Sequence, residues 1–367
     1  MTEAAPQLCA ACGGLMRFEP GSQRLRCAAC RGEQVLDDPG AAALAQALAE
    51  QDYAHYLALR AGQEPAIAAQ TVDCPQCGAR CEFPPMVVAM PCAFCAAPLQ
   101  ATQAHAQRQI RPHALLPFQL DDGAARQAFA RWVGSRWFAP NALKALVRSP
   151  DAGRGVYLPA WTIDAHSHSE YRGERGTHRQ VRETRQNAQG QSETVTRTVT
   201  DWTPVAGELD LQFDDELIPA SASLPAAGAP ALAMPELAVL RVVDADYQAG
   251  FQTEAYALGL EPAFAQAQAR FEARIRSAVE REIGGDEQRI HSLHSQFDAI
   301  RFRLILLPAW IYSYRFQGKV WQVVVNGHSG TVAGERPWSA WKIALTVAGV
   351  ALGAALLWWL GQGGSVA

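Results

Sequence analysis

The arrangement of the cysteines constrains the fold of this chain more than any other feature of its sequence. Eight of the nine cysteines fall into four C-x2-C pairs, and the pairs form two sets with the same C-x2-C-x14-C-x2-C spacing, 65 residues apart. The first set is Cys9, Cys12, Cys27 and Cys30, and the second is Cys74, Cys77, Cys92 and Cys95. Two such pairs on a short antiparallel hairpin bring four thiolates around one tetrahedral ion. The spacing therefore predicts two zinc ribbons, over residues 1–36 and 71–100, and two structural Zn²⁺ ions.

The chemistry expected of these cysteines is structural. Four protein thiolates leave no open coordination position, so neither site is expected to be catalytic. Redox-active C-x2-C pairs are the alternative, but here the pairs come in matched sets without a β-α-β context. Cys81 stands outside the pairs, and we expect it to be a small buried apolar side chain. No apolar secretory segment follows the acidic N-terminal stretch, which favours a reducing, cytoplasmic setting for the thiols.

The distribution of charge argues against a nucleic-acid partner. The net charge is -4, so the chain has no global basic field to attract phosphates. Residues 1–36 carry four arginines against three glutamates, and residues 71–100 carry one arginine against two acidic residues. Since neither ribbon has a basic stripe, we expect the ribbons to contact protein or to act as spacers rather than to bind DNA or RNA.

The C-terminal region predicts a membrane anchor. Residues 343–360 carry no charge and would form a helix of roughly 27 Å, close to the hydrocarbon thickness of about 30 Å. Tryptophans flank this run at both ends, as interfacial aromatic side chains do, at Trp338, Trp341, Trp358 and Trp359. Basic residues precede the run and none follows it, so we expect residues 338–361 to cross the bacterial inner membrane once, with the N-terminal body in the cytoplasm. A buried core helix is the alternative. Gly349 and Gly353 form a G-x-x-x-G pattern that can pair two such helices in a homodimer.

Between the cysteine sets and the C-terminal run, the sequence predicts an α+β body. Residues 37–70 are rich in Ala and Leu and predict a helical spacer between the ribbons. The body, residues 101–335, contains Leu-Pro-Ala-Trp twice, at 158–161 and at 307–310, and each copy leads into an alternating strand. We expect two related antiparallel β-elements, a protruding polar hairpin within the first, and a long amphipathic helix between the copies. The expected fold class is α+β, with two zinc ribbons, this body and one C-terminal transmembrane helix.

One group of polar residues could carry chemistry. It alternates along a predicted strand, so that its members would share one face, and it consists of Asp164, His166, His168 and Glu170. This face could bind a metal, but a solvated strand face requires polar residues at these positions in any case. The sequence contains neither a nucleophile-elbow motif nor a phosphate-binding loop. We therefore expect no enzymatic activity, the alternative being a hydrolase that uses the Asp164 to Glu170 face.

Several segments resemble a family of bacterial membrane-anchored zinc-ribbon proteins, whose members are often labelled as relatives of the primosomal helicase. The segments are LPFQL, WFAPNAL, YLPAWTIDAHSHSEYRGERGT and LLPAWIYSYRFQGKVWQVVVNGHSGTVAGERP, together with the terminal run. The missing phosphate loop contradicts the helicase label. The resemblance implies a partner that is an SPFH-domain (flotillin-like) or phage-shock membrane-stress protein, and it implies no catalytic residues. We expect a tail-anchored adaptor, the alternative being a membrane-tethered nucleic-acid-binding protein of replication or transcription.

Overall fold

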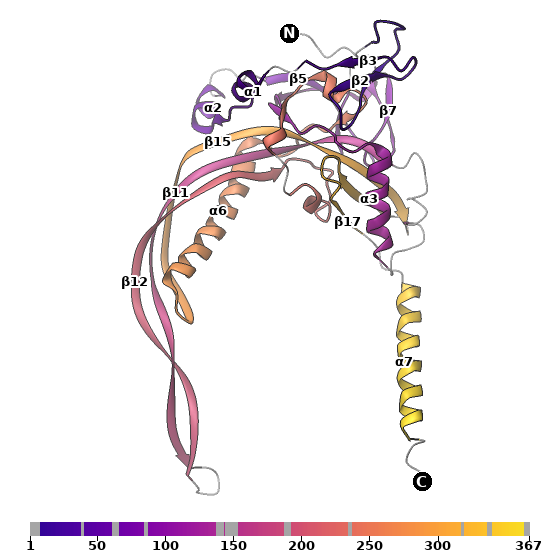
Figure 1. Ribbon diagram of the computed structural model, residues 1–367. Coiled ribbons are helices and arrows are strands. Elements are labelled where there is room, and N and C mark those ends of the chain that lie inside the picture. The colour runs from indigo at the N-terminus through magenta and orange to yellow at the C-terminus, as the bar shows by residue number, and fades with distance from the viewer. Residues whose placement is uncertain are drawn as a thin grey trace.

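The computed structural model describes residues 8–37, 40–60, 66–83, 87–136, 143, 153–186, 192–233, 237–316, 319–335 and 340–362. The strands (Figure 1) are β1 (Met16–Phe18), β2 (Arg24–Cys27), β3 (Glu33–Val35), β4 (Gln51–Asp52), β5 (Ala66–Asp73), β6 (Arg80–Glu82), β7 (Ala89–Pro91), β8 (Pro98–Gln100), β9 (His105–Ile110), β10 (Ala114–Leu115), β11 (Gly153–Gln186), β12 (Ser192–Pro219), β13 (Arg241–Val242), β14 (Gln252–Thr253), β15 (Glu287–Phe316), β16 (Lys319–Asn326) and β17 (Val332–Gly334). The α-helices are α1 (Ala41–Ala47), α2 (Tyr53–Arg60), α3 (Asp122–Gly134), α5 (Ala245–Gln248), α6 (Leu260–Ile283) and α7 (Ala340–Gln362). Three short 3-10 helices lie at Ala101–Gln103, Ala229–Ala231 and Leu237–Val239.

The protein is mainly β, which corrects the expected α+β class. Strands account for 46% of the structure and helices for 28%. The difference arises from three very long strands, because β11, β12 and β15 contain 34, 28 and 30 residues, whereas strands of five or six residues are typical. From the sequence we expected an alternating strand after each Leu-Pro-Ala-Trp copy and a protruding hairpin within the first, but not strands of this length.

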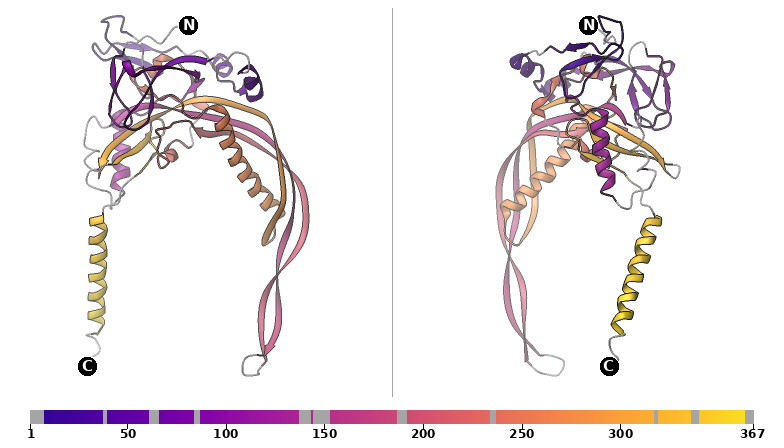
Figure 2. Two further views of the ribbon diagram at one scale, coloured as in Figure 1. Left: turned by 180° about the vertical axis from the view of Figure 1, so that it is seen from behind. Right: turned by 45° about the vertical axis from the view of Figure 1, so that its right-hand side comes forward.

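A nine-stranded sheet forms the centre of the molecule. Its main order is β12-β11-β15-β10-β13, and β4, β14, β16 and β17 pair at its margins. β11 pairs antiparallel with β12 on one side and with β15 on the other. Beyond the body these three strands curve away together, as Figures 1 and 2 show. We call this projection the arm and define it as residues 164–186, 192–216 and 287–301.

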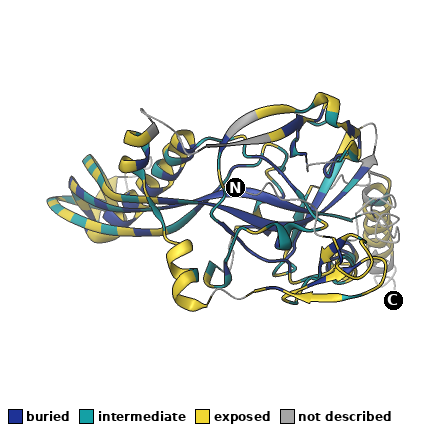
Figure 3. Cartoon of the chain, turned by 90° about the horizontal axis from the view of Figure 1, so that it is seen from above, coloured by how far each residue is buried: buried dark blue, intermediate teal, exposed yellow. Residues whose placement is uncertain are grey.

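The two Leu-Pro-Ala-Trp copies lie side by side in the central sheet. β11 and β15 pair antiparallel there, with Leu158 opposite Leu307. Every residue from Val156 to Ile163 and from Leu304 to Tyr312 is buried, and the central strands are accordingly dark blue in Figure 3. A strand that is covered on both faces needs apolar side chains on both, which explains why these segments do not alternate in polarity.

The two cysteine regions cover opposite faces of this sheet. Neighbouring residues of a strand point to opposite faces, so Tyr157 and Leu158 belong to different layers. Leu158 lies in a core with Phe94 and the second cysteine set, and Tyr157 lies in a core with Phe18 and the first. The second cysteine set is therefore built into the hydrophobic core, whereas the first set contributes Cys9 and Cys27 to its core and leaves Cys12 and Cys30 exposed.

A third core lies between the arm and α6. Figures 1 and 2 show α6 on the concave side of the curved strands. The buried residues of the helix recur at helical spacing, and they are Leu260, Ala263, Ala267, Phe271, Ile275, Ala278, Val279 and Ile283. Phe271 stacks on Phe213 of β12 with the ring centroids 4.1 Å apart. The helix ends at Ile283 and is capped by Gly284, whose φ of 67° lies in the left-handed region that favours glycine.

Among the residues that the structure describes, no helix is both long and apolar enough to cross a membrane. This finding corrects the predicted transmembrane helix at 338–361 and the predicted single-pass location in the inner membrane. α7 occupies this region, but Trp338 and the side chains at positions 343 and 360 lie outside the described residues.

Candidate metal centres

The first cysteine set converges as its spacing predicts. Cys9 Sγ lies 3.6 Å from Cys30 Sγ, and Cys12 Sγ lies 3.5 Å from Cys27 Sγ. All four sulfur atoms lie within 4.8 Å of one another. Four sulfurs bound tetrahedrally at the Zn–S distance of about 2.3 Å would be separated by about 3.8 Å. The cluster is thus spaced to hold one metal ion with four thiolates.

The second set has the same geometry. Cys74 Sγ lies 3.5 Å from Cys95 Sγ, and Cys77 Sγ lies 3.7 Å from Cys92 Sγ, again within one group of four. In both sets the first cysteine is next to the fourth, and the second is next to the third. Two candidate metal centres of one design therefore occur in the chain.

Each cysteine pair lies on a tight turn that directs both sulfurs to one point. The residue that follows each pair donates its backbone N–H to the carbonyl of the first cysteine of that pair, over 2.8 to 3.1 Å. These residues have φ between 60° and 73°, in the left-handed region, and they are Gly13, Arg31, Gly78 and Ala96. The roles of Arg31 and Ala96 could not be predicted from the sequence, because only glycine is a sequence signal for this conformation.

Backbone N–H groups at these turns favour the thiolate form. The N–H groups of Cys30 and Ala29 lower the pKa of Cys27 to about 6. The N–H groups of Ala11 and Cys12 lower the pKa of Cys9. Since the thiolate is the metal-binding form, these turns favour metal binding by Cys9 and Cys27.

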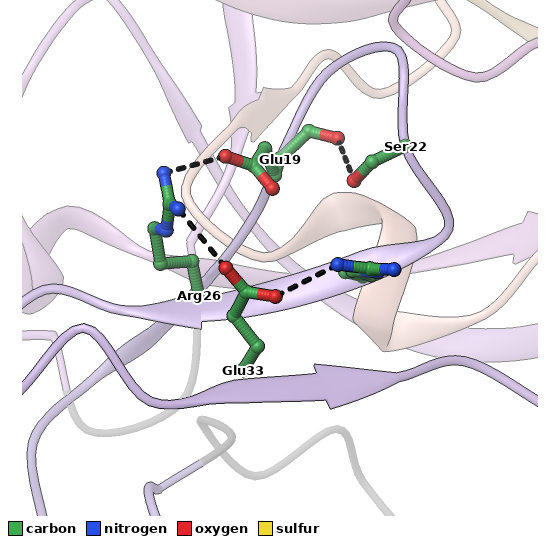
Figure 4. A network of polar contacts seen from close by, with 5 residues as sticks. Glu19, Ser22, Arg26 and Glu33 are labelled. Atoms are coloured by element: carbon green, nitrogen blue, oxygen red, sulfur yellow. Dashed lines mark hydrogen bonds and ion pairs between the residues drawn. The ribbon is translucent and has the colours of Figure 1, made fainter.

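Two of the four arginines of the first ribbon, Arg24 and Arg26, are paired with acids of the same ribbon. Figure 4 shows Arg26 between Glu19, at 2.7 Å, and Glu33, at 3.0 Å. Arg24 also pairs with Glu33, at 2.9 Å, and together these two arginines lower the pKa of Glu33. These guanidinium groups are therefore already neutralised locally.

The second ribbon is bound to the central sheet by polar contacts near its cysteines. The Phe94 carbonyl, between Cys92 and Cys95, accepts hydrogen bonds from Ser313 and, at 3.0 Å, from Gln322 Nε2. The Ala255 N–H donates to the Arg80 carbonyl over 2.9 Å. Cys81 is buried within this core, as its role as a small apolar side chain requires.

The Asp164 to Glu170 face does not form one site. Residues 163–170 of β11 alternate between buried and more exposed positions, so Asp164 and the histidines keep one face; the register shifts beside Asp164 lie in β12 and β15, each of which has one residue more than β11 there. His166 Nδ1 lies 3.0 Å from Asp298 Oδ1, and His168 Nδ1 lies 2.7 Å from Asp210 Oδ1. Each imidazole is thus paired with a separate carboxylate on a neighbouring strand, at the exposed surface of the arm.

Asp164 instead joins a carboxylate cluster that the sequence did not reveal. Its carboxylate lies within 4.8 Å of those of Glu50 and Asp215. Arg303 pairs with Glu50 at 2.9 Å and with Asp215 at 2.7 Å. Burial, together with the nearby Glu50, raises the pKa of Asp164 to about 7. These three acidic residues and Arg303 come from distant segments, so no local sequence pattern could indicate the cluster. The central Arg303 guanidinium favours an ion-pair network over a cation site.

The fold and these centres define a mainly β protein with two four-cysteine clusters that can each hold a metal ion. The chain is 23% identical over 245 residues to the uncharacterized protein YdjG of Bacillus subtilis (strain 168), an alignment that covers 66% of this chain and 69% of that protein. No family model and no solved structure matches the chain.

Proposed function

We propose that the protein is an adaptor whose metal-stabilised body presents the arm to a protein partner. The distal part of the arm, residues 177–186 paired with 192–201, carries this proposal. Its side chains are almost all exposed on both faces of the ribbon. A two-stranded ribbon is only marginally stable by itself in water. The length and the exposure of this projecting ribbon therefore favour a role as a contact surface over a purely structural role.

The two faces of the distal ribbon differ in chemistry. On one face three threonines of β12 lie opposite polar residues of β11, in the pairs Gln180–Thr198, Arg182–Thr196 and Thr184–Thr194. The other face carries Val181, Val195 and Val199, and Val195 is 44% exposed. These valines lie opposite Arg197, Glu183 and Arg179 respectively, so this face combines apolar and charged side chains, which suits contact with a protein. The partner class implied by the family resemblance, an SPFH-domain or phage-shock-type protein, stays a prediction.

We propose that the metal in both clusters is Zn²⁺. Four thiolates at tetrahedral spacing match structural zinc sites and leave no position for a substrate. Elemental analysis of the purified protein should give two zinc ions per chain. A content of one, or a different metal, would contradict this assignment.

The adaptor proposal is tested by affinity purification of the tagged full-length protein from its own cells after nuclease treatment, with mass spectrometry of the bound proteins. The matched control has a shortened arm in which Asn-Gly replaces residues 180–198, joining Arg179 to Val199, which face each other across the hairpin. We expect a defined partner to bind the full-length protein and to be depleted with the shortened arm, while both proteins keep their metal.

Two results would contradict the proposal. Equal recovery of the partner with both proteins would exclude the distal arm as the contact surface. Salt-dependent retention of DNA or RNA without a protein partner would favour the nucleic-acid alternative.

A further inference from the structure

The outer edge of β12 is open. β12 ends the main order of the central sheet, and within the described residues its only strand partner is β11. In an antiparallel edge strand, alternate residues leave their N–H and C=O groups directed outward without a ladder partner. This edge can therefore accept one further strand.

A shallow groove of about 440 Å³ lies beside this edge, between β12 and α6. Its lining residues come from these two elements alone and are Leu211, Gln212, Phe213, Ala273, Arg274, Ser277, Ala278 and Arg281. The helical members recur at one-turn spacing, so they share one face of α6. From the first to the last of them the helix rises about 12 Å, which matches three to four residues of an extended chain.

Small and apolar side chains form the inner part of the groove. Leu211 and Phe213 alternate along β12 and point to the same face, toward α6. Ala273, Ser277 and Ala278 leave room above them because their side chains are short. The groove thus offers space for one extended segment beside a strand that can hydrogen-bond it.

The charged residues that line the groove are both arginines, one of which is paired with a carboxylate beside it. Arg274 and Arg281 line it, and no acidic residue does. Arg274 is held in place, since it pairs with Glu216 at 2.6 Å and lies over the Phe213 ring at 4.7 Å. Arg281 is exposed, and among the described residues it makes no ion pair. A guanidinium in this setting favours carboxylates, to which it can donate two hydrogen bonds.

We propose that this groove binds an extended acidic segment of a partner protein, which adds as a strand to the outer edge of β12 and places its carboxylates against Arg274 and Arg281. The main-chain hydrogen bonds to β12 supply sequence-independent affinity, and the two arginines select the acidic side chains. This inference rests on the proposed adaptor function, for which it names a docking site and the chemistry of the segment that docks.

The test uses the full-length protein and fluorescein-labelled octapeptides in fluorescence anisotropy. The first peptide alternates valine or threonine with glutamate, and matched peptides carry glutamine or lysine in place of glutamate. Two further peptides keep the glutamates but carry backbone N-methyl groups on one or the other set of alternate residues. We expect the glutamate peptide to bind at least about tenfold more tightly than the glutamine peptide, the size of one charge-assisted hydrogen bond, and the lysine peptide not to bind.

N-methylation separates strand addition from simple charge attraction. Methyl groups that face β12 remove the donors needed by the edge, so one of the two methylated peptides should lose binding and the other should keep it. The protein variants are Arg281→Glu and, as a matched control, Arg276→Glu, which makes the same charge change at an exposed position of α6 outside the groove. We expect a loss of at least about tenfold for Arg281→Glu and little change for Arg276→Glu.

Several results would overturn the proposal. These are no binding of the glutamate peptide, equal loss in both variants, or equal binding of both methylated peptides. A concentration-dependent dimer that the glutamate peptide does not dissociate would place a second copy of the chain on this edge instead.

The affinity purification described above distinguishes the two levels of inference. If the cellular partner binds the wild type and Arg281→Glu equally, the groove proposal fails and the adaptor function survives. If no partner is recovered while the peptides behave as expected, the groove proposal survives and the adaptor function fails.

Discussion

Replacing Cys92 with serine should destabilise the central sheet as well as the second ribbon. The cysteine is fully buried in the core that the ribbon shares with the sheet. Structural zinc contributes about 10–16 kcal/mol of apparent binding free energy in small modules, as much as the whole unfolding free energy of a typical domain, about 5–15 kcal/mol. The ribbon should therefore unfold when the second metal is lost.

Unfolding of the ribbon would uncover one face of the sheet. The large aliphatic side chains of that face are Leu158, Ile305, Leu307 and Ile311, all at most 2% exposed. At about 1.5–3 kcal/mol for each buried side chain, their exposure would cost about 6–12 kcal/mol if they became fully solvated. This cost is large enough to open the sheet locally.

Hydrogen exchange with mass spectrometry measures the effect. In Cys92→Ser we expect the metal content to fall from two ions to one, and the amides of 156–163 and 304–311 to lose protection. If those amides keep wild-type protection after the second metal is lost, the reasoning is refuted and the ribbon is only an appended module. Stepwise removal of metal from the wild type with a chelator gives the same comparison if the variant is insoluble.

Cys81→Ala is the matched control for this experiment. Cys81 is buried in the same core but is not one of the four clustered cysteines. The change removes one sulfur atom and leaves the cluster complete. We therefore expect two metal ions and nearly wild-type protection in both segments of the sheet.

The remaining predictions concern the arm, the carboxylate cluster and the metal. Phe271→Ala should lower the free energy of unfolding in urea by about 3–5 kcal/mol, because it removes a fully buried ring stacked on Phe213, whereas the partly buried Phe264→Ala should cost less. The pKa of Asp164 is raised to about 7 in the folded state, so the folded protein holds a proton that the unfolded chain releases above about pH 4. The free energy of unfolding should therefore fall as the pH rises from about 4 to about 7. In Asp164→Asn, which keeps the oxygen that accepts from the Asp215 N–H, the free energy of unfolding measured in urea should change less across this range. Chelation of both metals should lower the urea midpoint of the wild type, and added Zn²⁺ should restore it; an unchanged midpoint would show that the clusters do not stabilise the fold.

The parts of the structure that follow from local spacing were predictable. The two C-x2-C sets converge because each pair lies on one turn, and a short hairpin joins the pairs. The aspartate that precedes α3 caps this helix, since the Asp121 side chain accepts from the Ala124 N–H. The long amphipathic helix was expected from its apolar period and is present as α6.

The functional surfaces depended on contacts between distant residues. The alternation of polar residues predicted one shared face for Asp164 and His166, and the burial pattern agrees, but Asp164 lies beside Glu50 and Asp215 whereas His166 pairs with Asp298. Arg303 meets Glu50 across about 250 residues of sequence, so no local pattern could indicate the pair. The groove between β12 and α6 also requires that a strand and a helix from separate segments lie side by side.

By itself the sequence determined the two four-cysteine clusters and the apolar runs of the central strands, because these depend on neighbours within a turn or along one strand. The tertiary structure alone decided that the clusters cover opposite faces of the sheet, that three strands continue as an arm, and that the edge of β12 stays open beside α6. Those features depend on which apolar surfaces bury one another, and that choice is made by packing between segments far apart in the chain.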